Sequence, residues 1–156
     1  MNTISKGQAI LATTGSGQLL LRIPVGIIFA AHGAQKLFGW FGGYGLEGTA
    51  QWMASIGLAP GFLMALLAAS AEFVGGIALI LGLATRPAAL ITGFTMVVAI
   101  GAVHLENGLF MSNNGYEFAL ALLAASAALT VQGAGSYSVD AYLAKQLASA
   151  AQRKTA

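Results

Sequence analysis

Four long apolar segments, separated by polar connections, make up most of the chain. Each segment reaches or approaches the ~20 apolar residues that a helix needs to cross the hydrocarbon core of a membrane. Because that core holds no water to bind backbone groups, a helix is the natural conformation for each segment. The sequence therefore predicts an all-α fold with four membrane-spanning helices, at residues 19–38, 60–83, 88–105 and 116–131.

The connection between the first two spans is long and aromatic. It contains Trp40, Phe41, Tyr44 and Trp52, and tryptophan and tyrosine gather where a membrane meets water. Within this connection Thr49 can cap a short helix, because a threonine hydroxyl accepts a hydrogen bond from the first turn. We expect this helix to lie on the outer membrane surface.

Both ends of the chain fall outside the predicted spans. Residues 1–18 are polar, and their apolar run is too short for a secretory signal, so we interpret them as a retained cytoplasmic leader. In the tail, residues 132–156, apolar residues recur at helical spacing around Tyr142 and Leu147. This spacing predicts a helix that lies in the cytoplasmic membrane interface. The transmembrane domain is then 19–131.

The composition excludes an ordinary soluble domain. Hydrophobic residues make up 57% of the chain and charged residues 8%, against about 25% charged in a typical soluble domain. There is no cysteine, which excludes disulfides, thiol chemistry, zinc thiolates and iron–sulfur ligation. The net charge of +2 gives no argument for binding nucleic acid. The lipid bilayer is the expected partner, and any redox role needs a bound cofactor or a partner protein.

The basic residues predict the orientation. Positive charge concentrates on the cytoplasmic side of membrane proteins. With four spans both termini lie on one side, and every Lys and Arg except Lys36 falls toward that side. Arg22, inside the first span, is expected to snorkel to the same interface. The sequence thus predicts a multi-pass membrane protein with cytoplasmic N- and C-termini.

Glu72 is the most informative ionisable residue, because it lies in the middle of the apolar segment 60–83. A carboxylate near the bilayer centre costs several kcal/mol unless it finds a partner, a proton or a watered cavity. Small residues surround Glu72 at helical spacing, including Ala69 and Gly76. This pattern favours close packing against another helix.

The other ionisable residues lie between the bilayer centre and the outer surface. His32 and Lys36 are four residues apart and share a face of the first span, whereas His104 and Glu117 fall near the outer ends of the third and fourth. The pattern predicts a polar pocket that opens outward, with Glu72 as its floor. Glu72 and His32 are candidate catalytic groups that handle protons. Lys36, His104 and Glu117 are candidate ligand-binding groups.

Several interpretations of this cluster remain open. The pocket suits a quinone carbonyl, proton movement or a small polar ligand, and the same residues suit a buried ion-pair network that only fixes helix register. Haem is disfavoured, because two histidines on different helices are a weak signal and His104 lies close to the surface. We assign no metal site. Residues 43–48 match G-x-G-x-x-G by letter, but they follow no strand, so we reject a dinucleotide site.

Three motifs occur together, one in the first span, one in the second and one after the fourth. They are Arg22…His32-Gly33…Lys36-Leu37-Phe38-Gly39, Glu72…Gly75-Gly76…Leu81-Gly82-Leu83, and Gly133-Ala134-Gly135-Ser136-Tyr137-Ser138-Val139-Asp140. In combination they resemble the DoxX family over roughly residues 19–143. Ala134 stands where the family's tail motif often has proline.

The resemblance implies a four-helix inner-membrane protein. The family takes its name from a subunit of an archaeal membrane complex that passes electrons from thiosulfate to quinone, and some bacterial members are tied to oxidative or thiol stress. It therefore favours a redox-associated role, as a quinone-interacting or accessory subunit of a quinone-linked oxidoreductase. Its partner would be a redox protein or a second copy of the chain. The alternatives are a small transport or ligand-binding membrane protein and a structural subunit, since fold alone does not establish function.

Overall fold

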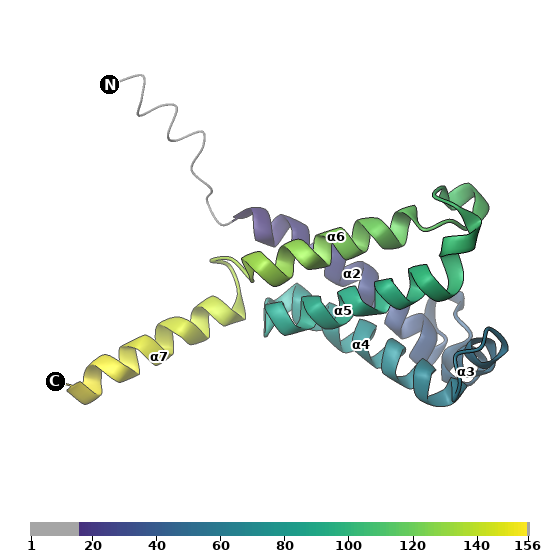
Figure 1. Cartoon of the computed structure of the whole chain (residues 1–156). Coiled ribbons are helices and arrows are strands. Elements are labelled where there is room, and N and C mark those ends of the chain that lie inside the picture. Colours follow the sequence, from purple (N-terminus) through teal and green to yellow (C-terminus); the bar gives the residue numbers. More distant parts are fainter. Residues whose placement is uncertain (1–15, 156) are drawn as a thin grey trace, which may run out of the picture.

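The computed structural model describes residues 16–155, and every regular element in that range is a helix (Figure 1). The predicted leader, residues 1–18, lies largely outside the described residues. Four helices form a bundle: α2 (Ser16–Phe38), α4 (Gly61–Leu81), α5 (Thr85–Ala99) and α6 (Glu117–Gln132). α3 (Gly45–Ser55) and α7 (Val139–Thr155) flank its two ends. Four single turns complete the described range: η1 (Trp40–Gly42), η2 (Ile100–His104), η3 (Leu105–Asn107) and η4 (Met111–Asn113).

Three of the described helical runs are long and apolar enough to cross a membrane. They are Ser16–Phe38, Gly61–Leu81 and the continuous run Thr85–Asn107, which joins α5 to η2 and η3. α6 is also apolar but has 16 residues, or about 24 Å at 1.5 Å per residue. This length is below the ~30 Å of the hydrocarbon core. The all-α membrane fold is therefore confirmed, while a fourth crossing by α6 stays a prediction.

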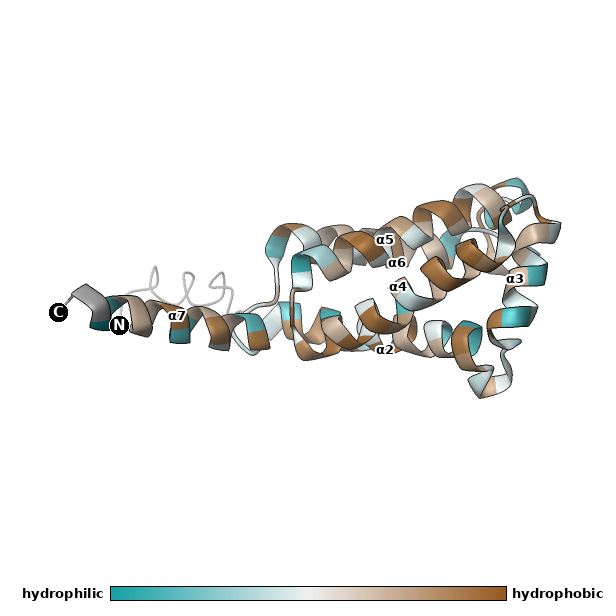
Figure 2. Cartoon of the chain, turned by 90° about the horizontal axis from the view of Figure 1, so that it is seen from below, coloured by the Kyte–Doolittle hydropathy of each residue, from teal (hydrophilic) through white to brown (hydrophobic). Residues whose placement is uncertain are grey.

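The outside of the bundle is apolar, as contact with lipid requires. Large hydrophobic side chains are widely exposed along the long helices, among them Leu20 at 74% and Val131 at 77%. Coloured by hydropathy, the ribbons of the bundle are mainly brown, and the polar colours gather toward its ends (Figure 2). Such a surface is unfavourable in water, so the distribution of side chains agrees with the membrane class that the composition predicts.

Small residues let the bundle helices approach one another closely. α2 packs on α4, α4 packs on α5, and α5 packs on α6, while α6 contacts α2 and so closes the ring. The contact between α2 and α4 is the most extensive of these. A methyl group added at Gly26 of α2 would lie 2.7 Å from the carbonyl oxygen of Gly76 in α4. Between α5 and α6, one added at Gly93 would lie 3.1 Å from the Cβ of Ser126. Association of helices in lipid depends on such packing, because lipid tails are as apolar as leucine.

The helix in the aromatic connection forms, but its start was predicted wrongly. α3 begins at Gly45, four residues before Thr49, and Thr49 is not its cap. The Thr49 hydroxyl instead donates to the carbonyl oxygen of Gly45 at 2.7 Å, one turn back along the helix. α3 packs on α4 through a small cluster of Ala50, Met53 and Ala65. It is thus attached to the bundle, at the end that we call the α3 end.

At the opposite end, which we call the α7 end, the expectation that Arg22 snorkels to the interface is wrong. Arg22 is only 2% exposed. Its guanidinium donates to the carbonyl oxygens of Leu79, at 2.9 Å, and of Ile80 and Tyr137. The last carbonyls of a helix lack partners within the helix, so burying Arg22 here satisfies the end of α4. The chain leaves α4 through Gly82 in a left-handed conformation with φ of 65°.

Asp140 completes the α7 end. Its carboxylate accepts hydrogen bonds from the backbone N–H groups of Ala84 and Thr85, at 2.7 and 2.9 Å, at the start of α5. Its own N–H donates to the carbonyl oxygen of Gly82 at 2.9 Å. The first turn of α7 is thus held against the turn between α4 and α5, and the rest of α7 extends away from the bundle (Figures 1 and 2). Its predicted position in the membrane interface stays a prediction.

Candidate functional site

Glu72 lies inside the bundle, on the face of α4 that packs against α2. It is 2% exposed, and its helix places the buried Ala69, Gly75 and Gly76 around it. These small residues bring the neighbouring helices close and leave room for one long polar side chain. The small-residue pattern around Glu72 therefore correctly indicated which face of α4 is buried.

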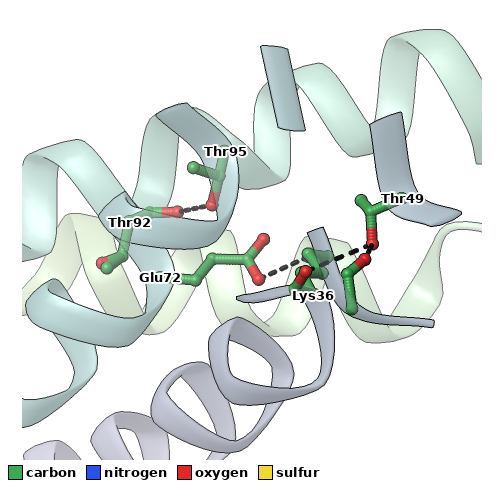
Figure 3. A network of polar contacts seen from close by, with 6 residues as sticks. Lys36, Thr49, Glu72, Thr92 and Thr95 are labelled. Carbon is green, nitrogen blue, oxygen red and sulfur yellow. Dashed lines mark hydrogen bonds and ion pairs between the residues drawn. The ribbon is translucent and has the colours of Figure 1, made fainter. Parts of the chain in front are cut away.

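Lys36 is the partner of Glu72. The ammonium group donates to the carboxylate across the α2–α4 contact, as an ion pair and a hydrogen bond. Figure 3 shows the two side chains pointing toward one another from their two helices. The Lys36 side chain is 28% exposed and that of Glu72 3%, so the lysine forms the outer member of the pair. Glu72 thus has the partner that a carboxylate in an apolar segment needs, and this partner is Lys36.

A cavity of about 170 Å³, which we call the bundle cavity, lies beside this pair, between α2, α4, α5 and α6. Four of the five predicted site residues line it: Glu72, Lys36, His32 and His104. Apolar side chains form much of the remaining wall, and they were not predicted as site residues. They are Phe29, Met96, Phe118 and Leu122.

The two histidines lie on different walls of the bundle cavity. His32 lies on α2, one turn before Lys36, and is exposed at the edge of the cavity. The centroid of the His32 ring lies 6.4 Å from that of the Phe118 ring. His104 ends the π-helical turn η2, where the regular helix α5 gives way to the following loop. Single π turns inside longer helices are frequent at functional sites, because they redirect side chains. The prediction of one regular helix over 88–105 missed this turn.

A hydrogen bond sets the orientation of the His104 ring. Its Nδ1 lies 2.8 Å from the carbonyl oxygen of Asn114. A carbonyl oxygen only accepts, so Nδ1 carries the proton, and Nε2 of the neutral ring is an acceptor. The lining of the cavity therefore includes a lysine donor on α2 and a histidine that has an acceptor nitrogen on η2. Asn114 itself lines the cavity, and no signal in the sequence singled it out.

Glu117, the fifth predicted residue, does not line the bundle cavity. Its carboxylate accepts a hydrogen bond from the backbone N–H of Met111 at 2.6 Å, and its N–H donates to the carbonyl oxygen of Leu109 at 2.9 Å. These contacts hold the loop between η3 and α6 in place. The structure therefore separates Glu117 from the other four residues and gives it a contact within the loop.

These features define the class of the protein: an integral membrane helical bundle with a polar centre. A family model, DoxX, matches residues 17–105. Because this match covers more than half of the chain, the chain belongs to the DoxX family, as the motifs around His32, Glu72 and Gly133 indicated.

Three named relatives agree with this assignment. The chain is 41% identical over 114 residues to a Bacillus subtilis protein named "Putative oxidoreductase CatD", covering 73% of this chain and 78% of the relative. It is 35% identical over 136 residues to the inner membrane protein YqjF of Escherichia coli, covering 83% and 94%. A third relative, the Escherichia coli inner membrane protein YphA, is 32% identical over 78% of this chain and 86% of its own length. No solved structure matches the chain.

Proposed function

We propose that this protein is a redox-associated subunit of the bacterial inner membrane that binds the head ring of a quinone in the bundle cavity. The observation that supports the proposal most is the Lys36–Glu72 ion pair beside a cavity that also contains two histidines. Ionisable residues within a membrane segment are costly and mark functional sites by default. The oxidoreductase name of the relative CatD supports the redox class.

The size of the bundle cavity suits a single ring. A cavity of about 150 Å³ is enough to hold benzene, and the bundle cavity measures about 170 Å³. One six-membered ring with two carbonyl groups therefore fits, whereas an isoprenoid tail has to remain outside. The apolar walls formed by Phe29 and Phe118 suit the faces of such a ring.

The polar groups suit the two ends of a quinone. The Lys36 ammonium donates to one carbonyl oxygen, and His104 Nε2 accepts from the hydroxyl that forms when the opposite carbonyl is reduced. Reduction of a quinone to a quinol takes up two electrons and two protons. In this proposal the electrons come from a redox partner protein, and the two protons come from water by way of Glu72 and His32. Each of these groups takes up a proton before it donates one to the ring, as a carboxylic acid and an imidazolium can.

The orientation forms part of the proposal. Arg22, Arg86 and the basic tail lie toward the α7 end, and Lys36 is near the α3 end. By the excess of basic residues on the cytoplasmic side, the α7 end faces the cytoplasm and both termini are cytoplasmic. Reporter fusions at Gly45 and after residue 156 test this. A periplasmic reporter at the C-terminus would overturn the assignment.

Mass spectrometry of the purified protein tests the quinone. We expect a co-purified quinone with the wild type and with Lys36→Arg, which keeps the positive charge and donors. Lys36→Met keeps the length but not the donor, and we expect it to lose the quinone. No quinone with any of the three folded proteins would contradict the proposal.

A second candidate function is structural, and one observation favours it. The ion pair joins α2 to α4, the two helices that pack most extensively. In this reading the pair fixes how the two helices meet, and the cavity stays empty. Absence of quinone from both the wild type and Lys36→Met, with both proteins folded, would favour this role.

A further inference from the structure

A second cavity lies at the α3 end, outside the bundle. It has a volume of about 570 Å³ and lies between the end of α2, the turn η1 and α3. Tyr44 and Trp52 form its aromatic sides, and glycines, among them Gly48, form much of the remaining wall. Tyr44 is 86% exposed and Trp52 44%, so this cavity is open to the surroundings. We call it the vestibule.

Lys36 belongs to both cavities. Of all the residues around the vestibule, Lys36 is the one that also lines the bundle cavity. Its ammonium group binds Glu72, which lines the bundle cavity, and its backbone carbonyl oxygen accepts from the hydroxyl of Thr49, which lines the vestibule, at 3.4 Å. Figure 3 shows Lys36 between these two residues. Lys36 therefore borders both spaces.

We propose that the vestibule is a binding site for the ring of an aromatic or quinonoid ligand on its way into the bundle cavity, and that Lys36 is the movable divider between the two. The identity of the ligand rests on the proposed function, whereas the route does not. The aromatic sides of the vestibule match a planar ring. The ring then passes Lys36 to reach the polar groups inside.

The boundary of the bundle cavity at the loop 105–116 is more firmly closed than the boundary at Lys36. The loop 105–116 covers it, held by the bond of His104 to Asn114 at 2.8 Å and that of Glu117 to Met111 at 2.6 Å. The backbone N–H of Tyr116 adds one more bond, to the carbonyl oxygen of Gly108 at 3.1 Å. Opening this side breaks several bonds together. Opening the vestibule side requires one ion pair to break and one lysine, a flexible four-carbon side chain, to rotate.

Cysteine labelling tests the route without any ligand. The chain has no cysteine, so a single Ala119→Cys, whose position is 6% exposed and lines the bundle cavity, reports access to it. The protein is held in lipid nanodiscs, where both membrane faces meet solvent, and treated with a small impermeant methanethiosulfonate. We expect Lys36→Ala to raise the labelling rate by about tenfold, because labelling follows local opening.

Lys36→Met is the matched control. Alanine and methionine both remove the charge and leave Glu72 unpaired, and they differ only in bulk. If the side chain at position 36 divides the two cavities, labelling is fast in Lys36→Ala and slow in Lys36→Met. Equal labelling rates in the two variants, whether fast or slow, would overturn the role of Lys36 as a divider. If Lys36→Ala alone does not fold, the same pair is compared in a Glu72→Gln background, which removes the unpaired carboxylate.

Two further arms place the route and the ligand. Gly48→Leu adds a side chain at the wall of the vestibule, and Tyr44 has to shift because the new Cβ would lie 2.8 Å from its Cβ. Thermal stability equal to that of the wild type checks that this variant folds. In the Lys36→Ala background it should slow the labelling of Cys at position 119, and an unchanged labelling rate would overturn the route.

Tryptophan fluorescence tests the ligand. Trp40→Phe leaves Trp52 as the only tryptophan, and tetramethylbenzoquinone should quench the fluorescence of Trp52 saturably. If the labelling rates are as expected but the quinone does not quench Trp52, Lys36 remains the divider and the quinone is ruled out as the ligand of the vestibule.

Discussion

The two ends of the bundle use charged side chains in opposite ways. At the α7 end, Arg22 and Asp140 are bound to backbone carbonyl and N–H groups, which they satisfy where α4 ends and α5 begins. At the α3 end, Lys36 and Glu72 bind one another beside a cavity. A charge that completes the backbone is structural, because its removal leaves buried polar groups unpaired. A charge paired beside a cavity remains available to a ligand.

The largest effect on stability is expected at Arg22. Arg22→Met leaves the carbonyl oxygens of Leu79, Ile80 and Tyr137 without this donor, and should lower the free energy of unfolding by about 3 kcal/mol, since each buried group left unpaired costs about 1–3. Thermal unfolding in detergent measures this. The folded fraction should bind quinone as the wild type does. If Arg22→Met were as stable as the wild type, the structural role assigned to Arg22 at the end of α4 would be wrong.

A smaller effect is expected at Asp140. Asp140→Ala removes the acceptor for the first N–H groups of α5, which should cost about 1 kcal/mol, the typical cost of losing a helix cap. Asp140→Asn keeps an acceptor oxygen and serves as the control. Chemical denaturation of the three proteins separates them. Equal destabilisation by alanine and asparagine would show that charge, rather than the cap, matters here.

Glu117 tests whether the comparison extends to the loop at the α3 end. Glu117→Gln keeps an acceptor for the N–H of Met111 but loses the charge, and charge-assisted bonds are about twice as strong as neutral ones. We expect a loss of about 0.5 kcal/mol in stability and no loss of co-purified quinone. Quinone lost from a folded Glu117→Gln protein would instead return Glu117 to the ligand-binding residues.

Much of the fold was visible in the sequence, because apolar segments in lipid have few conformational options. The ends of α2, α4 and α6 fall within three residues of the predicted ones. Local hydrogen bonding at Thr49 and the π turn before His104 were missed, because both depend on contacts between residues that periodicity does not reveal. Arg22 was missed for the same reason, since its partners are far away in sequence.

The candidate site was predictable in part. The cost of a carboxylate in lipid singled out Glu72, and helical spacing placed His32 and Lys36 on one face of α2. The vestibule could not be predicted, because it depends on how α3 folds back against the end of α2. Asn114 lies in a loop whose path is set by hydrogen bonds to His104 and Asn107, and loop paths leave no periodic pattern in a sequence.

Complementation by Glu72→Gln shows whether the proton of Glu72 is needed for function. Glutamine keeps the shape of glutamate and can still bond to Lys36, so stability should fall by only about 0.6 kcal/mol, the average worth of an interhelical hydrogen bond in a membrane. The amide cannot exchange the proton of a carboxylic acid. A deletion strain under oxidative stress should therefore not be rescued by this folded variant. Full rescue by stable Glu72→Gln protein would contradict the account and leave the ion pair as a structural feature.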